Sequence, residues 1–349
     1  MSSVPSILLA ILGLGFLIIV HEAGHFLVAR WSGMTVRRFS IGFGPALAKF
    51  DRWGTTFQIG AIPLGGFVQV DGLDPRDGTP PDDPGSYANK PFHLRFAMNL
   101  GGSAANYLFA FLALWAFFGF WRQVPTPPIE VTQVLEGSPA ERSGMQAGDL
   151  ITGTSTLAFS KIDEFGQALQ GAGPDGRVTL VGTRSGAEQT WVVRPEPSPD
   201  GSRLMVGLVY RPKGFVEEPM GLVPGAEVAL SQVIRISADS ARALLGLLNA
   251  KTRKNIEFQG PPGIVEELST AIRGSTASAL QALAVISAAL GWMNLLPIPG
   301  LDGSRLLFLL VGLVRRKEID PRVEVVIHTV GLIFLFGLII SISIGDLLK

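Results

Sequence analysis

Five consecutive residues near the start of the sequence, His21-Glu22-Ala23-Gly24-His25, have the types and spacing of a hydrolytic metal site. On a helix, residues four positions apart lie on the same face, so both imidazoles could reach one metal ion. Glu22 lies one position further round, where it could take a proton from a water molecule that the metal acidifies. The motif predicts zinc (Zn2+) as the cofactor, His21 and His25 as ligands, and Glu22 as the general base.

The apolar surroundings of this motif strengthen the prediction. Residues 4–30 form an apolar run long enough to cross a bilayer, and the motif lies inside it. Each ionisable side chain there costs about 2.5 kcal/mol or more if it is unpaired and faces lipid. The alternative is a helix end at the membrane surface with wetted polar groups. A functional metal site is favoured, because ionisable residues within a membrane are expensive to keep.

A third zinc ligand must come from elsewhere, because catalytic zinc commonly has three protein ligands. The chain has no cysteine, which leaves His, Asp or Glu. Asp302 follows Pro297 and Pro299 between two apolar stretches. Prolines break helices, and broken helices at membrane depth usually line polar cavities. Asp302 could simply cap the start of the next helix, but beside an incomplete two-histidine motif we predict that it is the third ligand.

Other polar side chains near the apolar runs are weaker candidates. His93 and His328 lie near the ends of apolar runs, where a wetted histidine is more common than a ligand. Asn106 lies inside the second apolar run and Asn294 near the break in the third, and each could hydrogen-bond to another helix. Asn294 could instead hold the backbone of a substrate.

The composition is typical of a protein that is partly embedded in a membrane. The chain of 349 residues is 47% hydrophobic and 17% charged, whereas soluble domains carry about 25% charged residues. The first apolar run has no Lys or Arg before it and no clean small-residue cleavage site, so we expect a span and not a removed signal peptide. We predict a multi-pass α-helical membrane protein with about four transmembrane helices, from apolar runs at 4–30, 96–121, 277–314 and 323–348.

Three further segments have their own character. Residues 38–71 mix β-formers with a Pro-Leu-Gly-Gly turn at 63–66 and predict a membrane-associated β-hairpin. Residues 125–213 alternate short β-branched runs with turn residues and predict an inserted mainly-β domain. Residues 222–251 have apolar residues at helical spacing and predict an amphipathic helix. This helix could lie along the membrane surface or pack on the bundle. The expected divisions are a membrane core at 1–124 and 276–349, the β domain at 125–213, and an amphipathic linker at 214–275.

The charges limit the partners and set an orientation. The net charge is zero, with 29 basic and 29 acidic residues, so nothing favours a nucleic-acid partner. Without cysteine, disulfides and thiolate nucleophiles are excluded. Short loops rich in Lys and Arg lie on the cytoplasmic side of membranes, and such loops follow the first apolar run (30–52) and join the last two (315–322). We expect these loops inside the cell, and the β domain and both chain ends outside.

Ordered motifs over nearly the whole chain carry a resemblance to a known family. They are HEAGH at 21–25, SIGFGP at 40–45, IPLGGFVQV at 62–70, NKPFHLRFAMNLGGSAAN at 89–106, QGPPGI at 259–264 and NLLPIPGLDG at 294–303. In the β domain, GSPA at 137–140 and AGDLI at 147–151 resemble a PDZ domain. The chain thereby resembles the site-2 protease family of intramembrane zinc metalloproteases, and more closely its bacterial RseP-type branch, with one PDZ-like domain.

The resemblance implies a site and a setting. His21, His25 and Asp302 look like the zinc ligands, Glu22 like the general base, and residues 38–70 like a hairpin that admits or unwinds substrate. It implies an enzyme of the bacterial inner membrane that cuts single-span membrane proteins, such as anti-sigma factors or leftover signal peptides, after an upstream site-1 protease. The active site would lie towards the cytoplasmic side. The expected substrate-binding residues are Asn294, Asn106, Pro297, Gly65 and Gly66.

Some positions depart from the family pattern. Ser304 stands where a second Gly often follows the Leu-Asp-Gly sequence, and Gly102-Ser103 stands where Gly-Pro is usual. Thr154-Ser155-Thr156 replaces a turn that is common in PDZ domains, which leaves peptide binding by the β domain open. None of these changes removes a predicted ligand.

Two other classes of function compete with a protease. A membrane scaffold that binds peptide termini through its β domain would be expected to have a decayed metal motif, but the predicted ligands and base are all present. A metal transporter could also use intramembrane His and Asp, but transporters usually contain internal repeats, which this sequence lacks. A hydrolytic enzyme is therefore favoured.

Overall fold

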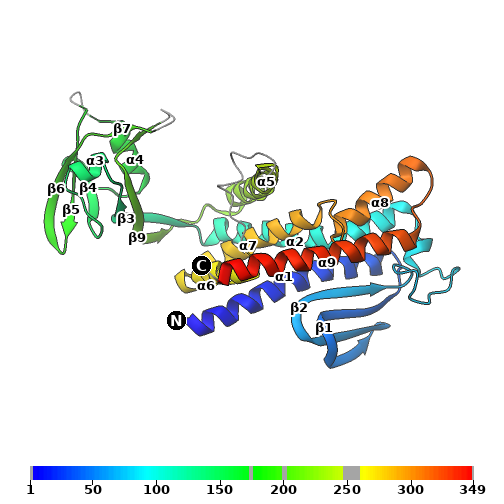
Figure 1. The fold of residues 1–349 in the computed structure, drawn as a ribbon. Helices are drawn as coiled ribbons and strands as arrows, with labels where there is room; N and C mark the ends of the chain where they lie inside the picture. Colours follow the sequence, from blue (N-terminus) through cyan, green and yellow to red (C-terminus); the bar gives the residue numbers. More distant parts are fainter. Residues whose placement is uncertain (1–2, 173–175, 199–202, 247–259, 348–349) are drawn as a thin grey trace. The chain divides into compact units, whose positions relative to one another are not determined.

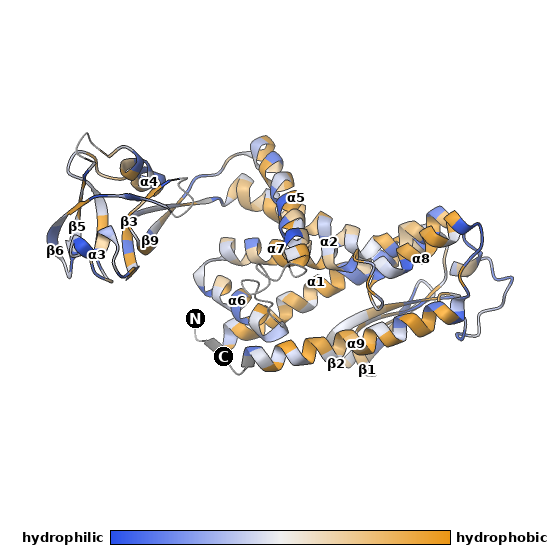
Figure 2. Cartoon of the chain, turned by 45° about the horizontal axis from the view of Figure 1, so that its top comes forward, coloured by the Kyte–Doolittle hydropathy of each residue, from blue (hydrophilic) through white to orange (hydrophobic). Residues whose placement is uncertain are grey.

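Long apolar helices form the body of the computed structural model, which describes residues 3–172, 176–198, 203–246 and 260–347 (Figure 1). Within those residues, four helices are long and apolar enough to cross a membrane. They are α1 (Ser3–Trp31), α2 (Phe92–Phe120), α7 (Thr276–Asn294) and α9 (Pro321–Leu347). Their apolar faces are visible along their length in Figure 2. The chain is that of an integral membrane protein with an inserted β domain, as the apolar runs predict.

The chain divides into two compact units. A membrane unit comprises Met1–Gly119 and Gly221–Lys349, and an inserted unit comprises Phe120–Met220. The inserted unit is longer at both ends than the predicted 125–213, because its first and last strands pair with each other from Gln123 to Glu217. The expected linker at 214–275 does not stand apart, because residues from Gly221 onward belong to the membrane unit.

The third apolar run forms two helices and not one. Helix α7 ends at Asn294, and α8 (Asp302–Arg315) begins only after a break. The break contains both prolines, and Gly300 adopts a positive φ of 99°, a backbone conformation that favours glycine. Asp302 is therefore the first residue of a helix, held at the end of an irregular loop.

Helices α1 and α2 meet backbone to backbone beside the predicted metal motif. A Cβ atom on Gly24 would collide with the carbonyl oxygen of Gly101, and one on Gly101 would lie 2.8 Å from the carbonyl oxygen of Gly24. Small residues allow such close approach between helices in a membrane. This contact brings the backbone of α2 against the face of α1 that carries the two histidines.

The predicted hairpin is present, but its turn lies elsewhere. Strands β1 (Val36–Arg52) and β2 (Thr55–Val70) are joined at Trp53-Gly54, where both residues have positive φ angles of 53° and 76°. Two consecutive positive φ angles are typical of a tight hairpin turn. The prediction of a turn at 63–66 is wrong, because these residues continue β2.

The pairing within this sheet places the end of β2 at one of its edges. Residues 38–41 of β1 pair with 66–69 of β2 and also with 56–59, so the first part of β1 has β2 on both of its sides. Segment 66–70 pairs with β1 alone. In the described part of the chain, segment 66–70 is thus an edge strand, and β2 also packs against α1.

Large apolar side chains are exposed on the rest of this sheet. They include Leu47, Phe50, Trp53, Ile59 and Ile62. Exposed apolar surface of this kind marks contact with membrane or protein. It agrees with the prediction that the hairpin is membrane-associated.

Two amphipathic helices pack on the bundle. Helix α5 (Leu222–Gly246) buries Ala229 and Val233 in a cluster with side chains of α2 and α7. Helix α6 (Pro261–Gly274) packs against α1, α7 and α9. Of the two arrangements left open for residues 222–251, packing on the bundle holds for 222–246, while 247–251 lie outside the described residues. Gln259 of the family motif also lies outside them.

The inserted unit is built mainly of strands, as predicted. Strands β3 (Gln123–Val134), β4 (Leu150–Thr154), β5 (Val178–Arg184), β6 (Ala187–Val193) and β9 (Leu208–Glu217) form one sheet in the order β6-β5-β4-β3-β9. Two short strands, β7 (Glu196–Pro197) and β8 (Leu204–Met205), pair separately. Two helices, α3 (Pro139–Arg142) and α4 (Asp163–Gln170), accompany the sheet. Its identity as a PDZ domain stays a prediction.

Candidate functional site

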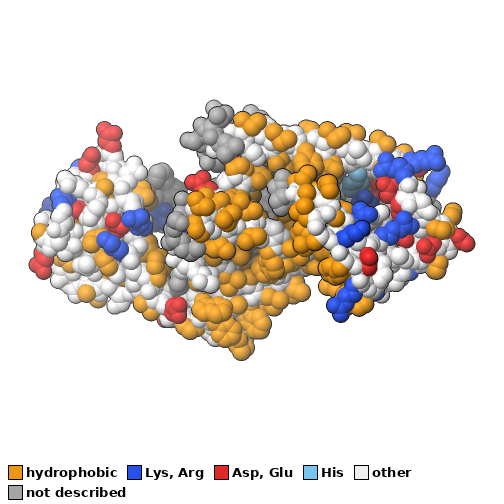
Figure 3. Space-filling model, turned by 90° about the horizontal axis from the view of Figure 1, so that it is seen from below, with side chains coloured by type: hydrophobic (Ala, Val, Ile, Leu, Met, Phe, Trp, Pro, Cys, Tyr) orange, Lys and Arg blue, Asp and Glu red, His pale blue; other side chains and the backbone are white. Residues whose placement is uncertain are grey.

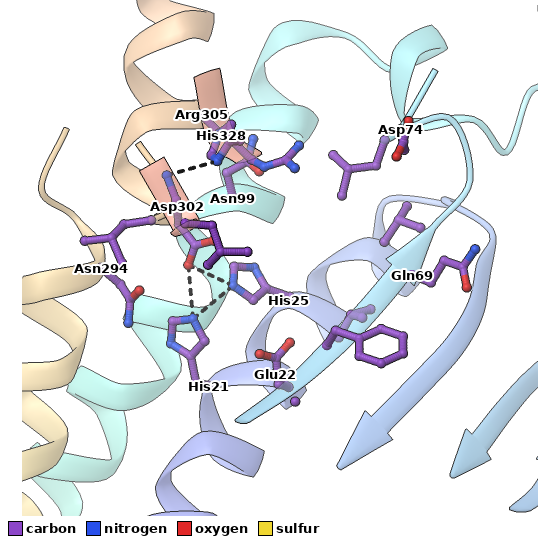
Figure 4. Close-up of a pocket in the computed structure, with 18 of the residues that line it drawn as sticks. His21, Glu22, His25, Gln69, Asp74, Asn99, Asn294, Asp302, Arg305 and His328 are labelled. Atoms are coloured by element: carbon purple, nitrogen blue, oxygen red, sulfur yellow. Dashed lines mark hydrogen bonds and ion pairs between the residues drawn. The ribbon is translucent and has the colours of Figure 1, made fainter. Parts of the chain in front are cut away.

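Three side chains from distant parts of the chain converge in the membrane unit (Figure 4). His21 Nε2 lies 3.0 Å and His25 Nε2 lies 3.1 Å from the same carboxylate oxygen, Oδ2 of Asp302. The two Nε2 atoms are 3.2 Å apart. The donor atoms therefore form a nearly equilateral triangle, and they are the only group of three such residues among the described positions that could hold a metal ion.

The sequence explains why these atoms meet. His21 and His25 are four positions apart on α1, so their rings lie on one face. Asp302 begins α8 directly after the proline-containing break, which carries it out of α7 and towards α1. In a continuous helix through 294–303, Asp302 would remain on the axis of α7. The break between α7 and α8 therefore makes the third donor available.

The donor set suits zinc. Two imidazole nitrogens and one carboxylate oxygen are common ligands of catalytic zinc, and they leave a fourth position for a substrate or water. Bonds of about 2.0–2.2 Å in a tetrahedral site place neighbouring donors about 3.3–3.5 Å apart. The triangle of 3.0–3.2 Å needs only a slight expansion to match this.

A backbone carbonyl orients one of the imidazoles. His25 Nδ1 lies 2.8 Å from the carbonyl oxygen of Met98 in a buried contact, and only an N–H there can donate to it. The hydrogen bond leaves the lone pair of Nε2 directed at the donor cluster, the usual arrangement of a metal-binding histidine. His21 and His25 are 8% and 7% exposed, so both imidazoles are shielded from solvent.

Gly102 on α2 leaves room for both rings. A Cβ atom at this position would collide with His25 Nε2 and would lie 2.7 Å from His21 Nε2. No sequence pattern singles out this glycine for a role at the metal site. The only signal is a cluster of small residues, Gly101 to Ala105, within a long apolar helix.

Glu22 lies between the histidine pair and the open edge of β2 (Figure 4). Its side chain is half-buried, and a Cβ atom on Gly66 would lie 3.1 Å from its Cγ. Gly66 thus lets the edge strand approach the carboxylate closely. The carboxylate is placed to exchange protons with a molecule bound beside the donor cluster.

A cavity of about 780 Å³ contains these groups. Of the residues predicted from the sequence, it is lined by His21, Glu22, His25, Asp302, Asn294, Gly65 and Gly66. It is also lined by the edge segment Gly66–Val70 and by Asn99, which the sequence did not single out. Asn99 is buried and donates from Nδ2 to the hydroxyl of Tyr87 at 2.7 Å.

Two predicted substrate-binding residues lie elsewhere. Asn106 is completely buried on α2, and its backbone oxygen accepts a hydrogen bond of 3.0 Å from Ser287 of α7. The side-chain nitrogen and oxygen of Asn106 have no hydrogen-bond partner among the described residues, so the alternative of a side-chain hydrogen bond to another helix is not borne out either. Pro297 lies in the break but is exposed and is not among the cavity residues.

The two weaker histidine candidates are not in the donor cluster. His93 is exposed near the start of α2. His328 lines the cavity from α9, but its ring nitrogens face Gly300 and Ser304.

Charged side chains line the cavity away from the donor cluster. Arg76 donates to both oxygens of Asp74 at 2.9 and 2.8 Å, and this hydrogen bonding lowers the pKa of Asp74. Arg305, three residues beyond Asp302 on α8, faces the same space. In Figure 3, Lys and Arg side chains of the membrane unit gather together with acidic side chains, apart from the broad hydrophobic surface of that unit.

Comparison with known proteins identifies the family of the chain. Residues 9–338 match the model of peptidase family M50. A protein of Nostoc sp. named "Putative zinc metalloprotease" is 33% identical over 349 residues, covering 98% of this chain and 95% of that protein. Proteins with the same description from Clostridium acetobutylicum (28% identical, 98% and 97% covered) and Rickettsia conorii (30% identical, 97% of each covered) are similar throughout. The chain belongs to peptidase family M50, the site-2 proteases, and is a zinc metalloprotease.

Proposed function

We propose that this zinc metalloprotease hydrolyses peptide bonds within the membrane-spanning segments of single-span proteins. One observation carries the proposal: the convergence of His21, His25 and Asp302 next to Glu22, in a cavity that is also lined by an open strand edge. The donor cluster supplies a metal site, and the strand edge supplies a place for an extended peptide. His21, Glu22 and His25 lie on α1, a helix apolar enough to be surrounded by lipid, and β2 packs against that helix.

Each residue near the cluster has a separate task. His21, His25 and Asp302 would hold the zinc ion, which when bound polarises the scissile carbonyl and makes water more acidic. Glu22 takes the proton from the attacking water and returns it to the nitrogen of the leaving amine. Met98 keeps His25 in the tautomer that directs Nε2 at the cluster.

The strand edge offers hydrogen-bond partners to a substrate helix that must unwind before it is cut. A helix hides its peptide bonds in its own hydrogen bonds, so the substrate must unwind locally before it can be cut. Segment 66–70 can pair with the unwound stretch as an added strand and replace the lost backbone hydrogen bonds. Gly66 leaves the part of this edge beside Glu22 without a side chain, Gly65 precedes it in the cavity wall, and Asn294 lines the cavity where it can contact the substrate backbone.

The setting that we propose is the inner membrane of a bacterium. In this setting the basic segments at 30–52 and 315–322 lie in the cytoplasm, and the active site lies towards that side. The inserted unit then lies outside, where as a PDZ-like domain it limits substrate size or senses a newly cut C-terminus. Substrates would be anti-sigma factors or signal-peptide remnants already trimmed by a site-1 protease.

The test is cleavage of a single-span substrate in reconstituted vesicles by the parent enzyme and the Glu22→Gln variant. Loss of a general acid–base typically slows a reaction by about 10²- to 10⁴-fold, so cleavage by Glu22→Gln should fall in that range. Glu227→Gln, an exposed position on α5, serves as the matched control. Mass spectrometry should place the cut inside the apolar segment. Equal rates for Glu22→Gln and the parent, or a cut confined to soluble regions, would overturn the proposal.

A further inference from the structure

We propose that His328 and Ser304 form a hydrogen-bonded clamp that holds Asp302 in the orientation needed to bind zinc. The inference rests on the proposed role of Asp302 as a ligand. It assigns a positioning role to two side chains that lie outside the donor cluster. Ser304 belongs to α8, and His328, on α9, contacts both Ser304 and Gly300 of the break.

The donor and the acceptor of each hydrogen bond in the clamp can be assigned. The backbone N–H of Gly300 can only donate, so His328 Nδ1, at 3.3 Å, must accept. The proton of the neutral ring is then on Nε2, which donates to Ser304 Oγ at 3.1 Å. Ser304 in turn donates its hydroxyl proton to the carbonyl oxygen of Leu301 at 2.8 Å. Each polar atom in this series of hydrogen bonds therefore has a suitable donor or acceptor as its partner.

These contacts bracket Asp302 on both sides. Gly300 and Leu301 directly precede it, and Ser304 follows it by two positions. Asp302 lies at the junction of an irregular loop and a helix start, where its direction depends on how that loop is held. His328 belongs to α9, so the clamp ties the loop and the start of α8 to a separate helix.

Packing between α9 and the loop supports the clamp. A Cβ atom on Gly331, three residues beyond His328, would collide with Pro299, and one on Gly300 would lie 3.0 Å from the backbone nitrogen of Leu332. The ring of Phe308 on α8 meets the ring of His328 edge-on, with centroids 6.0 Å apart. The histidine is thus fixed by packing as well as by its hydrogen bonds.

A direct role at the metal does not fit His328. Both of its ring nitrogens are engaged, one by Gly300 and one by Ser304, and it is outside the donor cluster. Ser304 is the position where this chain departs from the Leu-Asp-Gly-Gly pattern of the family, and glycine could not make either of the hydroxyl's hydrogen bonds. The clamp is therefore a feature of this chain's own side chains.

The test measures zinc affinity and the absorption spectrum of the Co²⁺-substituted full-length protein in detergent. Changing groups that orient a metal ligand typically weakens metal binding by about 10- to 100-fold. We expect His328→Phe and Ser304→Ala each to weaken zinc binding by about 10-fold and to alter the Co²⁺ spectrum. Because Ser304 acts through its contact with His328, the double variant should bind zinc no more weakly than His328→Phe alone. His328→Gln, which can still donate to Ser304, should recover part of the loss only when Ser304 is present.

Controls separate the clamp from a general loss of stability. Zinc titrations are made below the unfolding temperature of each metal-free variant, and His93→Phe, at an exposed histidine, should bind zinc like the parent. If His328→Phe does not fold, Ser304→Ala decides the matter. Zinc affinities and Co²⁺ spectra equal to those of the parent for the clamp variants would overturn the inference.

A further variant tests the assumption beneath the clamp. Asp302→Asn should weaken zinc binding more than any clamp variant does. If Asp302→Asn binds zinc like the parent, the ligand assignment fails. If it binds weakly while the clamp variants are unchanged, only the clamp fails.

Discussion

At the scale of single residues, the metal site depends on the absence of a side chain at Gly102. We predict that Gly102→Ala weakens zinc binding and cleavage by about 10- to 100-fold, the range seen when the surroundings of metal ligands are disturbed. The added methyl group would collide with His25 and crowd His21. Overpacking of this kind destabilises by about 1–3 kcal/mol. Zinc titration and a cleavage assay of the purified variant measure both effects.

The matched control is Gly337→Ala on α9. A Cβ atom there meets no other atom within 4 Å, and alanine favours a helix over glycine by about 1 kcal/mol. Its activity should equal that of the parent. An active Gly102→Ala enzyme with normal zinc affinity would show that α2 lies further from the histidines than described.

Much of the candidate site could be predicted from the sequence, because its main parts follow local rules. The spacing of His21 and His25 specifies one helix face, and the prolines before Asp302 specify a break that frees a carboxylate. The roles of Gly102 and of the Met98 carbonyl could not be predicted. Both depend on where α2 crosses α1, and a contact between backbones leaves little trace in side-chain patterns.

At the scale of elements, the edge of β2 is the part that should decide substrate binding. We predict that Gly66→Val abolishes cleavage while zinc binding stays close to that of the parent. A Cβ atom at this position would lie 2.8 Å from the carbonyl oxygen of Ser40 and 3.1 Å from Cγ of Glu22. The larger side chain would push the strand away from the base and fill the space where the substrate should lie. Cleavage rates and zinc content of the same preparation measure the two properties.

Ala48→Val provides a comparison within the same sheet. Ala48 is exposed on the second half of β1 and is not a cavity residue, so this variant should cleave normally. Equal loss of activity in both variants would mean that the sheet matters for folding and not for substrate contact.

The hairpin also shows the limit of local turn rules. Pro-Leu-Gly-Gly at 63–66 is a strong turn signal, yet it continues a strand that bends between its two pairings with β1. The actual turn, Trp53-Gly54, lacks the Asn-Gly or Asp-Gly pair usual at such positions. Pairing across the sheet outweighed the local preference, and a single sequence does not reveal that pairing.

A buried ion pair should stabilise the inserted unit. Asp149 is completely buried, and Arg184 donates to its two carboxylate oxygens at 2.6 and 2.8 Å. Arg184→Ala leaves the buried carboxylate of Asp149 without its ion-pair partner, so this variant should expose the unit to proteolysis. Arg142→Ala breaks an exposed pair with Glu196, which should change stability by at most about 1 kcal/mol. Equal protease resistance of both variants would contradict this account.

At the scale of the whole molecule, the orientation in the membrane can be tested directly. The chain has no cysteine, so single cysteines can be labelled without background. We predict that Lys317→Cys, in the exposed basic loop between α8 and α9, is protected from an impermeant maleimide in spheroplasts. Glu188→Cys, exposed on the inserted unit, should be labelled. Both should react after permeabilisation, and the opposite pattern would reverse the proposed orientation.

The number and order of apolar helices agreed with the sequence because hydropathy and length are summed over many residues. The extent of the inserted unit was less predictable. Its outer strands pair across most of the unit's length, from Gln123 to Glu217, and only that pairing shows that both belong to one sheet.

X-ray absorption at the zinc edge tests the central claim most directly, because it reports the atoms bound to the metal. For the parent enzyme, the account predicts one zinc ion per chain bound by two imidazole nitrogens and by oxygen, with bonds of about 2.0–2.2 Å. The Asp302→Ala variant should lose most of its zinc. A zinc site with the same content and the same ligand shell in Asp302→Ala would contradict the account, because α1 and α8 would then not share one metal.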